Sequence, residues 1–221
     1  LRRIEAADPA QVDASRTLGI AFPVAVGTTY PVVWDFVRAL PPGRGAPAFM
    51  VDTLGGMSGG IVGPLRRVLE AKGYHPIGAR EIPMPPNVFV KMSDAWDERR
   101  RARGIAQARR YAEELLAGQA RWGRIPILSD LVYAVVGSRW MWQLVALTAH
   151  RLVVDEVACT RCGLCAEMCP AGNISLAPYP VSAGRCQECM RCLTFCPTHA
   201  LRPAWFAPGR YRAVEARELR R

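Results

Sequence analysis

The sequence predicts an α/β domain with a parallel sheet, followed by a small α+β domain organised around cysteines. Apolar runs as long as strands alternate with helical patterns between residues 16 and 93, and this alternation is typical of a parallel sheet with right-handed crossovers. All eight cysteines of the 221-residue chain lie in one stretch near its end. We predict an α/β domain at 1–118, a helical linker at 119–152, a cysteine domain at 153–206 and a basic tail at 207–221.

Three segments of the first domain have the pattern of buried parallel strands. Residues 17–26 form an apolar run that ends in a loop with a proline, and residues 48–53 form a second run. Residues 76–82 form a third run, whose signal is weaker. Strands of a parallel sheet are covered on both faces, so we expect continuous apolar runs rather than alternating ones.

Helical patterns follow these strands. Residues 31–40 and 61–72 place apolar side chains on one face, and they end at Pro41-Pro42-Gly43 and at Gly73. Residues 94–118 have an apolar stripe that predicts the closing helix of the domain. The arginines between 99 and 110 predict a solvated face of this helix.

Residues 125–149 are rich in Leu, Val, Trp and Met. Residues 131–149 have the length of a membrane span, but Arg139 lies in the middle and Gly137-Ser138 interrupts the run. We therefore expect two short helices packed between the domains. The alternative is a peripheral membrane contact in which Trp140 and Trp142 anchor at the interface.

The cysteines follow a repeated pattern. The run Cys159-x2-Cys162-x2-Cys165-x3-Cys169-Pro170 recurs as Cys186-x2-Cys189-x2-Cys192-x3-Cys196-Pro197, with a period of 27 residues. Three thiolates at i, i+3 and i+6 let a short loop wrap one cubane of iron and sulfide. One half alone could not bury its cluster, so two halves that face each other form the minimal domain.

This run resembles that of bacterial ferredoxins with two 4Fe-4S clusters, in which the fourth cysteine of each run binds the other cluster. The resemblance implies that cluster I is bound by Cys159, Cys162, Cys165 and Cys196. Cluster II is bound, by the same resemblance, by Cys186, Cys189, Cys192 and Cys169.

Two other chemistries use cysteines, and both fit the spacing less well. Structural zinc sites take two separated pairs of ligands, whereas this chain has two triplets, each with a trailing Cys-Pro. A disulfide framework is typical of small secreted chains. We expect five apolar residues to keep water from the clusters: Ile174, Leu176, Leu193, Phe195 and Leu201. Gly163 is expected to let the backbone approach cluster I, because it has no Cβ.

Four motifs of the first domain resemble the flavodoxin half of flavodoxin–ferredoxin fusion proteins, the EFR1 family. They are Phe22-Pro-Val-Ala-Val-Gly27, Thr53-Leu-Gly-Gly-Met-Ser-Gly-Gly60, Lys72-Gly-Tyr74 and Met84-Pro-Pro-Asn87. The stretch Cys169-Pro170-x2-Asn173-Ile174 fits the same family, so the resemblance extends from about residue 16 to residue 203. It implies a flavodoxin-like parallel sheet followed by a ferredoxin-like domain.

The resemblance also implies a flavin, because flavodoxin-like folds bind FMN outside the carboxyl ends of their strands. The loops at 23–30 and 53–60 would flank the flavin ring. The residues expected to contact it are Pro23, Val24, Gly27, Thr53, Gly55, Gly56 and Ser58.

Two features of the flavodoxin pattern lie outside this sequence or differ in it. The first strand and the phosphate loop are expected upstream of Leu1, and residues 2–5 are expected to end the second strand. FMN binding is therefore expected only in an N-terminally complete form. Ala25 stands where the family often has an aromatic residue in the first ring loop, and Tyr30 is expected to substitute for it.

The chain carries a net charge of +10, from 29 basic and 19 acidic residues. No nucleic-acid recognition motif accompanies this charge, so we do not expect a nucleic-acid partner. A basic surface also suits docking of an acidic redox protein. No signal peptide is visible, which favours the cytoplasm.

These observations predict an electron carrier rather than a stand-alone enzyme. Single electrons would pass through two 4Fe-4S clusters, coupled to a flavin in the complete protein, to and from a redox partner protein. Two alternatives remain: a flavin-dependent reductase, and a non-catalytic docking subunit with a degenerate flavodoxin half. The flavin loops have no Cys, His or acidic cluster near them in the sequence, and this argues against the reductase.

Overall fold

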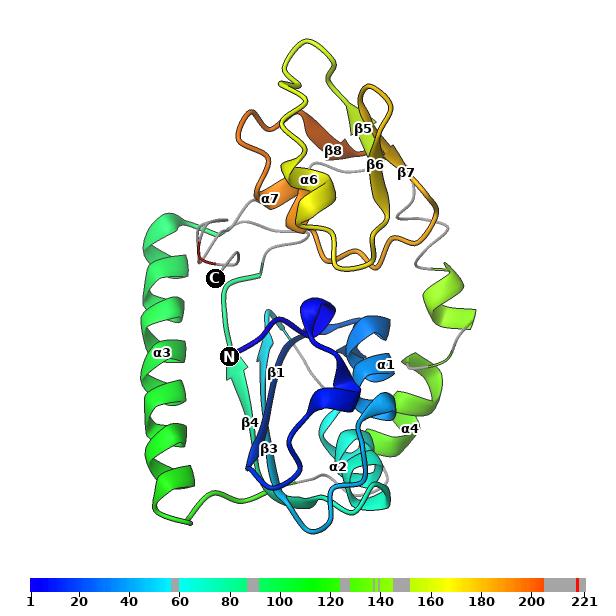
Figure 1. Cartoon of the computed structure of the whole chain (residues 1–221). Coiled ribbons are helices and arrows are strands. Elements are labelled where there is room, and N and C mark those ends of the chain that lie inside the picture. Colours follow the sequence, from blue (N-terminus) through cyan, green and yellow to red (C-terminus); the bar gives the residue numbers. More distant parts are fainter. Residues whose placement is uncertain are drawn as a thin grey trace. The chain divides into compact units, whose positions relative to one another are not determined.

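The computed structural model describes residues 1–56, 60–86, 92–123, 128–136, 138, 140–144, 152–204 and 218 (Figure 1). The chain divides into two compact units. The N-terminal unit comprises Leu1–Met84 and Ala95–Ser138, and the C-terminal unit comprises Pro85–Asp94 and Arg139–Arg221.

The N-terminal unit is built on a four-stranded sheet with the order β2-β1-β3-β4. The strands β1 (Leu18–Ala25), β3 (Pro47–Leu54) and β4 (His75–Pro83) run parallel, as the sequence predicted. The short strand β2 (Thr28–Thr29) folds back antiparallel onto the end of β1, so the sheet is mixed. The register places Pro23 beside Thr53 and Thr53 beside Ile82, which aligns the carboxyl ends of the three parallel strands.

Helices lie on both sides of this sheet. Figure 1 shows α1 (Pro31–Ala39), α2 (Val62–Ala71) and α4 (Leu128–Val136) on one side, and α3 (Asp94–Leu116) on the other. The first three predicted helices of the domain are confirmed to within two residues at each end. Most arginines of α3 are exposed, as expected of a solvated face.

The core of the N-terminal unit lies between the sheet and α1 and α2. Alternate residues of the strands point into it, including Phe22 and Met50, which pack with Val37 and Leu65. On the other face, α3 packs close to β4, where Tyr111 approaches Gly78. Gly19 and Ala21 on that face of β1 are exposed. The expectation of strands buried on both faces is therefore wrong for β1, because one helix does not cover the whole face.

The N-terminal segment differs from the prediction. Residues 2–5 do not end a strand; the chain forms two 3-10 turns, η1 (Ile4–Ala6) and η2 (Pro9–Gln11). The backbone bonds locally, since the N–H of Ala6 donates to the carbonyl of Arg3 at 3.1 Å. Asp8 caps η2 by accepting a hydrogen bond from the N–H of Ala10 at 3.0 Å.

The predicted region of two short helices is partly described. It contains α4 and a second helical segment at residues 140–144. Their predicted packing between two domains remains a prediction. No helix within the described ranges is both long enough and apolar enough to cross a membrane.

The C-terminal unit has short elements only. Strand β5 (Leu152–Val154) pairs antiparallel with β8 (Leu201–Pro203), and β6 (Ile174–Leu176) pairs with β7 (Pro180–Ser182). The helices α6 (Leu164–Glu167) and α7 (Arg191–Thr194) have one turn each. A shift of 27 residues takes the bounds of α6 to those of α7 and the bounds of β6 to those of β8. The sequence repeat is therefore also a repeat of backbone structure.

Candidate metal centre

One cavity of the C-terminal unit is lined by Cys159, Cys162, Cys165 and Cys196. The first three come from the loop that enters α6 and from α6 itself, and Cys196 follows α7. These four thiols are the set that the sequence analysis assigned to cluster I. Cys162 is exposed and Cys165 is buried, so the ligands of this cavity differ in their exposure to solvent.

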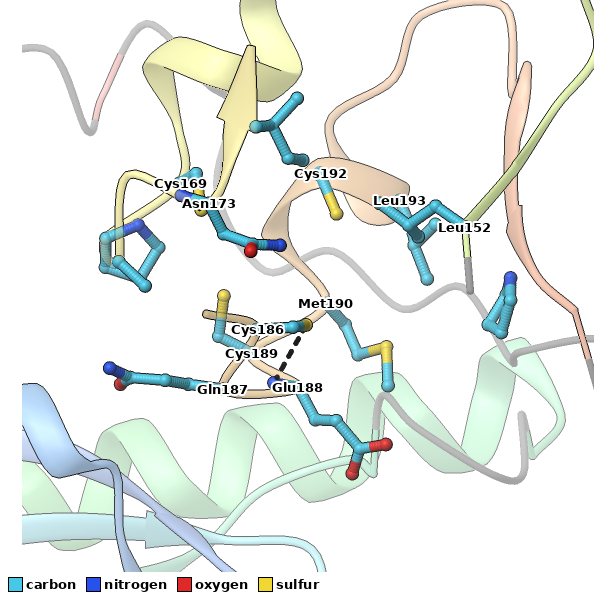
Figure 2. Close-up of a pocket in the computed structure, with 14 residues that line it drawn as sticks. Leu152, Cys169, Asn173, Cys186, Gln187, Glu188, Cys189, Met190, Cys192 and Leu193 are labelled. Atoms are coloured by element: carbon cyan, nitrogen blue, oxygen red, sulfur yellow. Dashed lines mark hydrogen bonds between the residues drawn. The ribbon is translucent and has the colours of Figure 1, made fainter. Parts of the chain in front are cut away.

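A second cavity is lined by Cys169, Cys186, Cys189 and Cys192, the set assigned to cluster II. Figure 2 shows Cys169 reaching this site from the chain after α6, while the other three thiols come from the loop before α7 and from α7. Each cavity thus takes three cysteines from one run and one from the other run. The apolar part of the second wall is formed by Leu152, Ile174, Met190, Leu193, Pro170 and Pro203.

Backbone amides donate to sulfurs around the second cavity. The N–H of Asn173 donates to Sγ of Cys169 at 3.2 Å, and the N–H of Glu188 donates to Sγ of Cys186 at 3.4 Å (Figure 2). At the first cavity, Sγ of Cys196 lies 3.8 Å from Oγ1 of Thr198. Such bonds stabilise negative charge on sulfur and so raise the reduction potential of a bound cluster.

Asn173 has a structural role that the sequence analysis did not assign. Its side chain is buried, and its Nδ2 donates to Oγ of Ser182 at 3.0 Å. The N–H of Arg185 donates to Asn173 Oδ1 at 2.5 Å. These bonds hold the segment that leads into Cys186 against the segment that follows Cys169. Asn173 therefore fixes the junction at which the two runs supply ligands to one cavity.

Burial raises the pKa of several thiols. It raises the pKa of Cys189 to about 11, and Cys169 and Cys186 nearby disfavour its thiolate further. Burial also raises the pKa of Cys165, Cys186 and Cys192. Cys162 and Cys196 add to the shift at Cys165, so the thiols of one set affect each other across the two runs. Iron binding must release these protons, because the thiolate is the metal ligand.

The arrangement fits a polynuclear cluster. Within the described part of the chain, no three His, Cys, Asp or Glu side chains are grouped as a site for a single metal ion. A cubane does not need such convergence, because each of its four cysteines binds a different iron. Four thiols spread around a largely apolar wall, with amides directed at sulfur, match its requirements.

The ligand loops use left-handed backbone conformations. Gly163 has φ 77°, and a Cβ there would meet only Leu176, at 3.6 Å. The equivalent position in the second run is Met190, with φ 58°. The left-handed conformation thus gives a further reason for Gly163, and its close approach to cluster I remains a prediction.

Four of the five residues expected to exclude water are buried: Ile174, Leu193, Phe195 and Leu201. Leu176 is 41% exposed, although it lines the first cavity. Its role in keeping water from cluster I remains a prediction, and its strand β6 pairs only with β7 among the described strands.

The described residues among those predicted to contact a flavin lie near the carboxyl end of the sheet. Pro23 pairs in register with Thr53, and Val24 pairs with Thr29 in the β1–β2 hairpin. The N–H of Gly60 donates to the carbonyl of Gly27 at 2.8 Å, which joins the two loops. Gly55 and Gly56 are exposed, and Ser58 lies outside the described residues.

Two further charged residues lie at this end of the sheet, and the sequence analysis missed both. Arg100 of α3 donates through Nη2 to the carbonyl of Gly55 at 2.9 Å and through Nε to that of Met84 at 3.0 Å. Asp52 of β3 is fully buried, and neither of its carboxylate oxygens has a hydrogen-bond partner among the described residues. Burial, with a smaller contribution from Glu81, raises the pKa of Asp52 to about 8.

Comparison with known proteins concerns the C-terminal unit. The 4Fe-4S binding domain family matches residues 152–175. A ferredoxin-like protein in the vnf region of Azotobacter chroococcum mcd 1 is 40% identical over 53 residues, which cover 21% of this chain and 82% of that protein. A protein of the same description from Azotobacter vinelandii is 38% identical over 53 residues, with the same coverage. No solved structure shows significant similarity to the chain.

The cavities, the cysteine spacing and these matches support iron-sulfur electron transfer as the activity of this region. The flavodoxin resemblance has no counterpart among the matched proteins. Through its cysteine-rich C-terminal unit, the chain belongs to the 4Fe-4S ferredoxins.

Proposed function

We propose that this protein transfers single electrons through two 4Fe-4S clusters. One observation carries the proposal: the eight cysteines line two cavities, four in each, with one ligand exchanged between the two runs. The exchange ties both halves of the unit to both clusters. Loss of either cluster would therefore disturb the whole unit rather than one half.

The residues of the chain have separate tasks in this function. Cys159, Cys162, Cys165 and Cys196 hold cluster I, and Cys169, Cys186, Cys189 and Cys192 hold cluster II. When bound, each cluster accepts and releases one electron. Amides of Asn173 and Glu188 stabilise the added negative charge, and the buried apolar residues keep water away.

Cys165 and Cys192 lie at the point where the two sites approach each other. Both belong to the short helices, and α6 contacts α7. The thiol of Cys165 contributes to the raised pKa of Cys192, after burial and the closer thiols Cys189, Cys186 and Cys169. This proximity supports an electron path between the clusters through these two residues.

The number of clusters is tested by anaerobic reconstitution with iron and sulfide. We expect about eight irons and about eight sulfides per chain, with the brown absorbance of 4Fe-4S centres. Stoichiometric zinc without sulfide, in protein isolated anaerobically, would contradict the proposal. A single cluster of about four irons would limit it to one site.

We further propose a flavin partner centre at the carboxyl ends of β1, β3 and β4. Support comes from the aligned strand ends and from the hydrogen bond that joins the loops of Gly27 and Gly60. FMN bound there would exchange electrons with the clusters, in a form of the protein that also supplies a phosphate loop. Titration of FMN into this chain and into one extended upstream, followed by flavin fluorescence, tests this. Failure of the extended chain to bind would favour a docking role for the N-terminal unit.

The electron donor or acceptor is proposed to be a redox protein, met through a basic surface. A cytoplasmic location suits eight free cysteines, because thiols remain reduced there. Pull-down from a cytoplasmic extract under anaerobic conditions, at low and high salt, tests both points. A partner that is retained only at low salt is expected for electrostatic docking.

A further inference from the structure

The two ligand loops share left-handed backbone positions but carry opposite charges at one paired position. Three pairs of residues separated by 27 positions share left-handed conformations: Gly163 with Met190, Gly172 with His199, and Arg161 with Glu188. The third pair has φ angles of 56° and 54°. Each member of that pair lies between the first and second cysteine of its run. One site therefore has a cation where the other has an anion.

Both residues line a cavity, and the charge of Glu188 disfavours the thiolate of Cys186. Arg161 lines the cavity of cluster I, and Glu188 lines the cavity of cluster II (Figure 2). Arg161 is exposed, and its guanidinium lies 5.4 Å from the ring centre of Tyr179. Glu188 is half-buried and also donates its backbone N–H to Cys186. The charges differ in environment as well as in sign.

Reduction adds one negative charge to a cluster, so a nearby cation favours the reduced state and a nearby anion disfavours it. We propose that Arg161 raises the potential of cluster I and that Glu188 lowers the potential of cluster II. The proposal rests on the proposed binding of two clusters. Through the charges at this paired loop position, the chain would give two otherwise similar clusters different reduction potentials.

Other charges act on the same sites. Arg191 of α7 lies near Cys189 and favours its thiolate, so it opposes Glu188 at cluster II. Arg185 is exposed and donates to the carbonyl of Gly172 at 2.8 Å. Substitution of Arg161 or Glu188 alone leaves these other charges in place, so it measures the sign of that residue's own effect on the reduction potential.

The two effects are expected to differ in size. Water and salt screen an exposed charge strongly and a half-buried charge much less. We therefore expect the smaller effect from Arg161 and the larger effect from Glu188. Raising the salt concentration is expected to reduce the first effect more than the second.

The experiment is a potentiometric titration of the reconstituted protein at pH 8, with dithionite as reductant and electron paramagnetic resonance as readout. This pH lies well above the ordinary pKa of a glutamate side chain. Arg161→Gln is expected to lower the potential of one reduction wave. Glu188→Gln is expected to raise the potential of the other wave. Arg202→Gln is the matched control, because Arg202 is exposed and lines neither cavity.

The charge exchange Arg161→Glu with Glu188→Arg provides a second measurement. It is expected to shift both waves further than the single substitutions do, in the same two directions. Iron content is measured first for each variant, so that failure of cluster assembly is distinguished from failure of tuning. Full iron content with unshifted waves, or with both single variants shifted the same way, would overturn the proposal.

Discussion

The two units of this protein are stabilised by different means. The N-terminal unit has a continuous apolar core between its sheet and helices, formed by Ile20, Phe22, Val33, Trp34, Val37, Leu40, Ala46, Ala48, Met50, Ile61, Leu65, Leu69, Tyr74 and Trp122. The buried cluster of the C-terminal unit contains five residues, one of them a cysteine: Cys165, Ile174, Met190, Leu193 and Leu201. Its described strands have three residues each, and its helices α6 and α7 have four residues each.

This difference indicates where each unit obtains its stability. Burial of apolar surface stabilises the first unit at about 25 cal/mol per Å², without any cofactor. A region as small as the second seldom buries enough surface, and metal binding supplies the missing free energy of folding in such cases.

Removal of iron is expected to unfold the C-terminal unit and leave the N-terminal unit folded. Without iron, the raised pKa values keep buried thiols such as Cys189 protonated, and nothing joins the two runs at each cavity. Hydrogen exchange after anaerobic chelation measures this unit by unit. We expect rapid exchange in residues 152–204 and continued protection in β1 and β3. Protection of both units after complete iron loss would contradict the comparison.

Removal of one cysteine is expected to damage one cluster. The cluster that is lost should be the one whose cavity that cysteine lines, whichever run the cysteine belongs to. Cys169→Ala and Cys189→Ala should lose the same cluster, because both thiols line the second cavity. Cys196→Ala and Cys162→Ala should lose the other. Each variant should retain about four of about eight irons. Electron paramagnetic resonance of the reduced variants identifies the remaining cluster; different spectra within one pair would show that the assignment is wrong.

A truncation in the apolar core is expected to destabilise the N-terminal unit alone. Leu65 is fully buried between α2 and the sheet, so Leu65→Ala should reduce the free energy of unfolding by about 2–5 kcal/mol. The exposed Leu116 of α3 provides the control, and Leu116→Ala should have little effect. Urea unfolding gives the stability, and iron analysis should show full cluster content in both variants. Loss of iron in Leu65→Ala would mean that the units do not fold independently.

The smallest expected effect is a pH dependence caused by Asp52. Its pKa is about 8 in the folded protein, above the ordinary value of an aspartate. The folded state therefore holds this proton more tightly than the unfolded state. The stabilising contribution is complete below about pH 4, where the carboxyl is protonated in both states, and is lost as pH rises towards 8.

Asp52→Asn should remove this part of the pH dependence and increase stability most above pH 8. Glu81→Gln should weaken the dependence only slightly, because Glu81 contributes less than burial to the raised pKa. Urea unfolding of the three proteins between pH 5 and pH 9 measures the differences. Parallel curves for wild type and Asp52→Asn would show that the carboxyl is paired or hydrated in solution.

Much of the organisation of this protein could be predicted from its amino-acid sequence. The spacing of the cysteines determines which thiols share a loop, and their 27-residue period predicted the repeat that α6 and α7 display. Apolar runs predicted the three parallel strands, and Gly and Pro marked the ends of α1 and α2. These features are local, because a periodic pattern or a turn residue acts within a few positions of itself.

Contacts between residues distant in the sequence could be known only from the tertiary structure. The burial of Asp52 without a partner, the contact of Arg100 with Gly55, and the bond between Gly60 and Gly27 required the sheet and its helices to assemble. The sequence of residues 2–5 is compatible with a strand or with a 3-10 turn, and in the structure local hydrogen bonds form the turn. Asn173 shows the same limit, since its side chain matters only because Ser182 and Arg185 return to it in space. Hydrogen bonding and burial depend on which groups meet after folding, and composition and spacing do not contain that information.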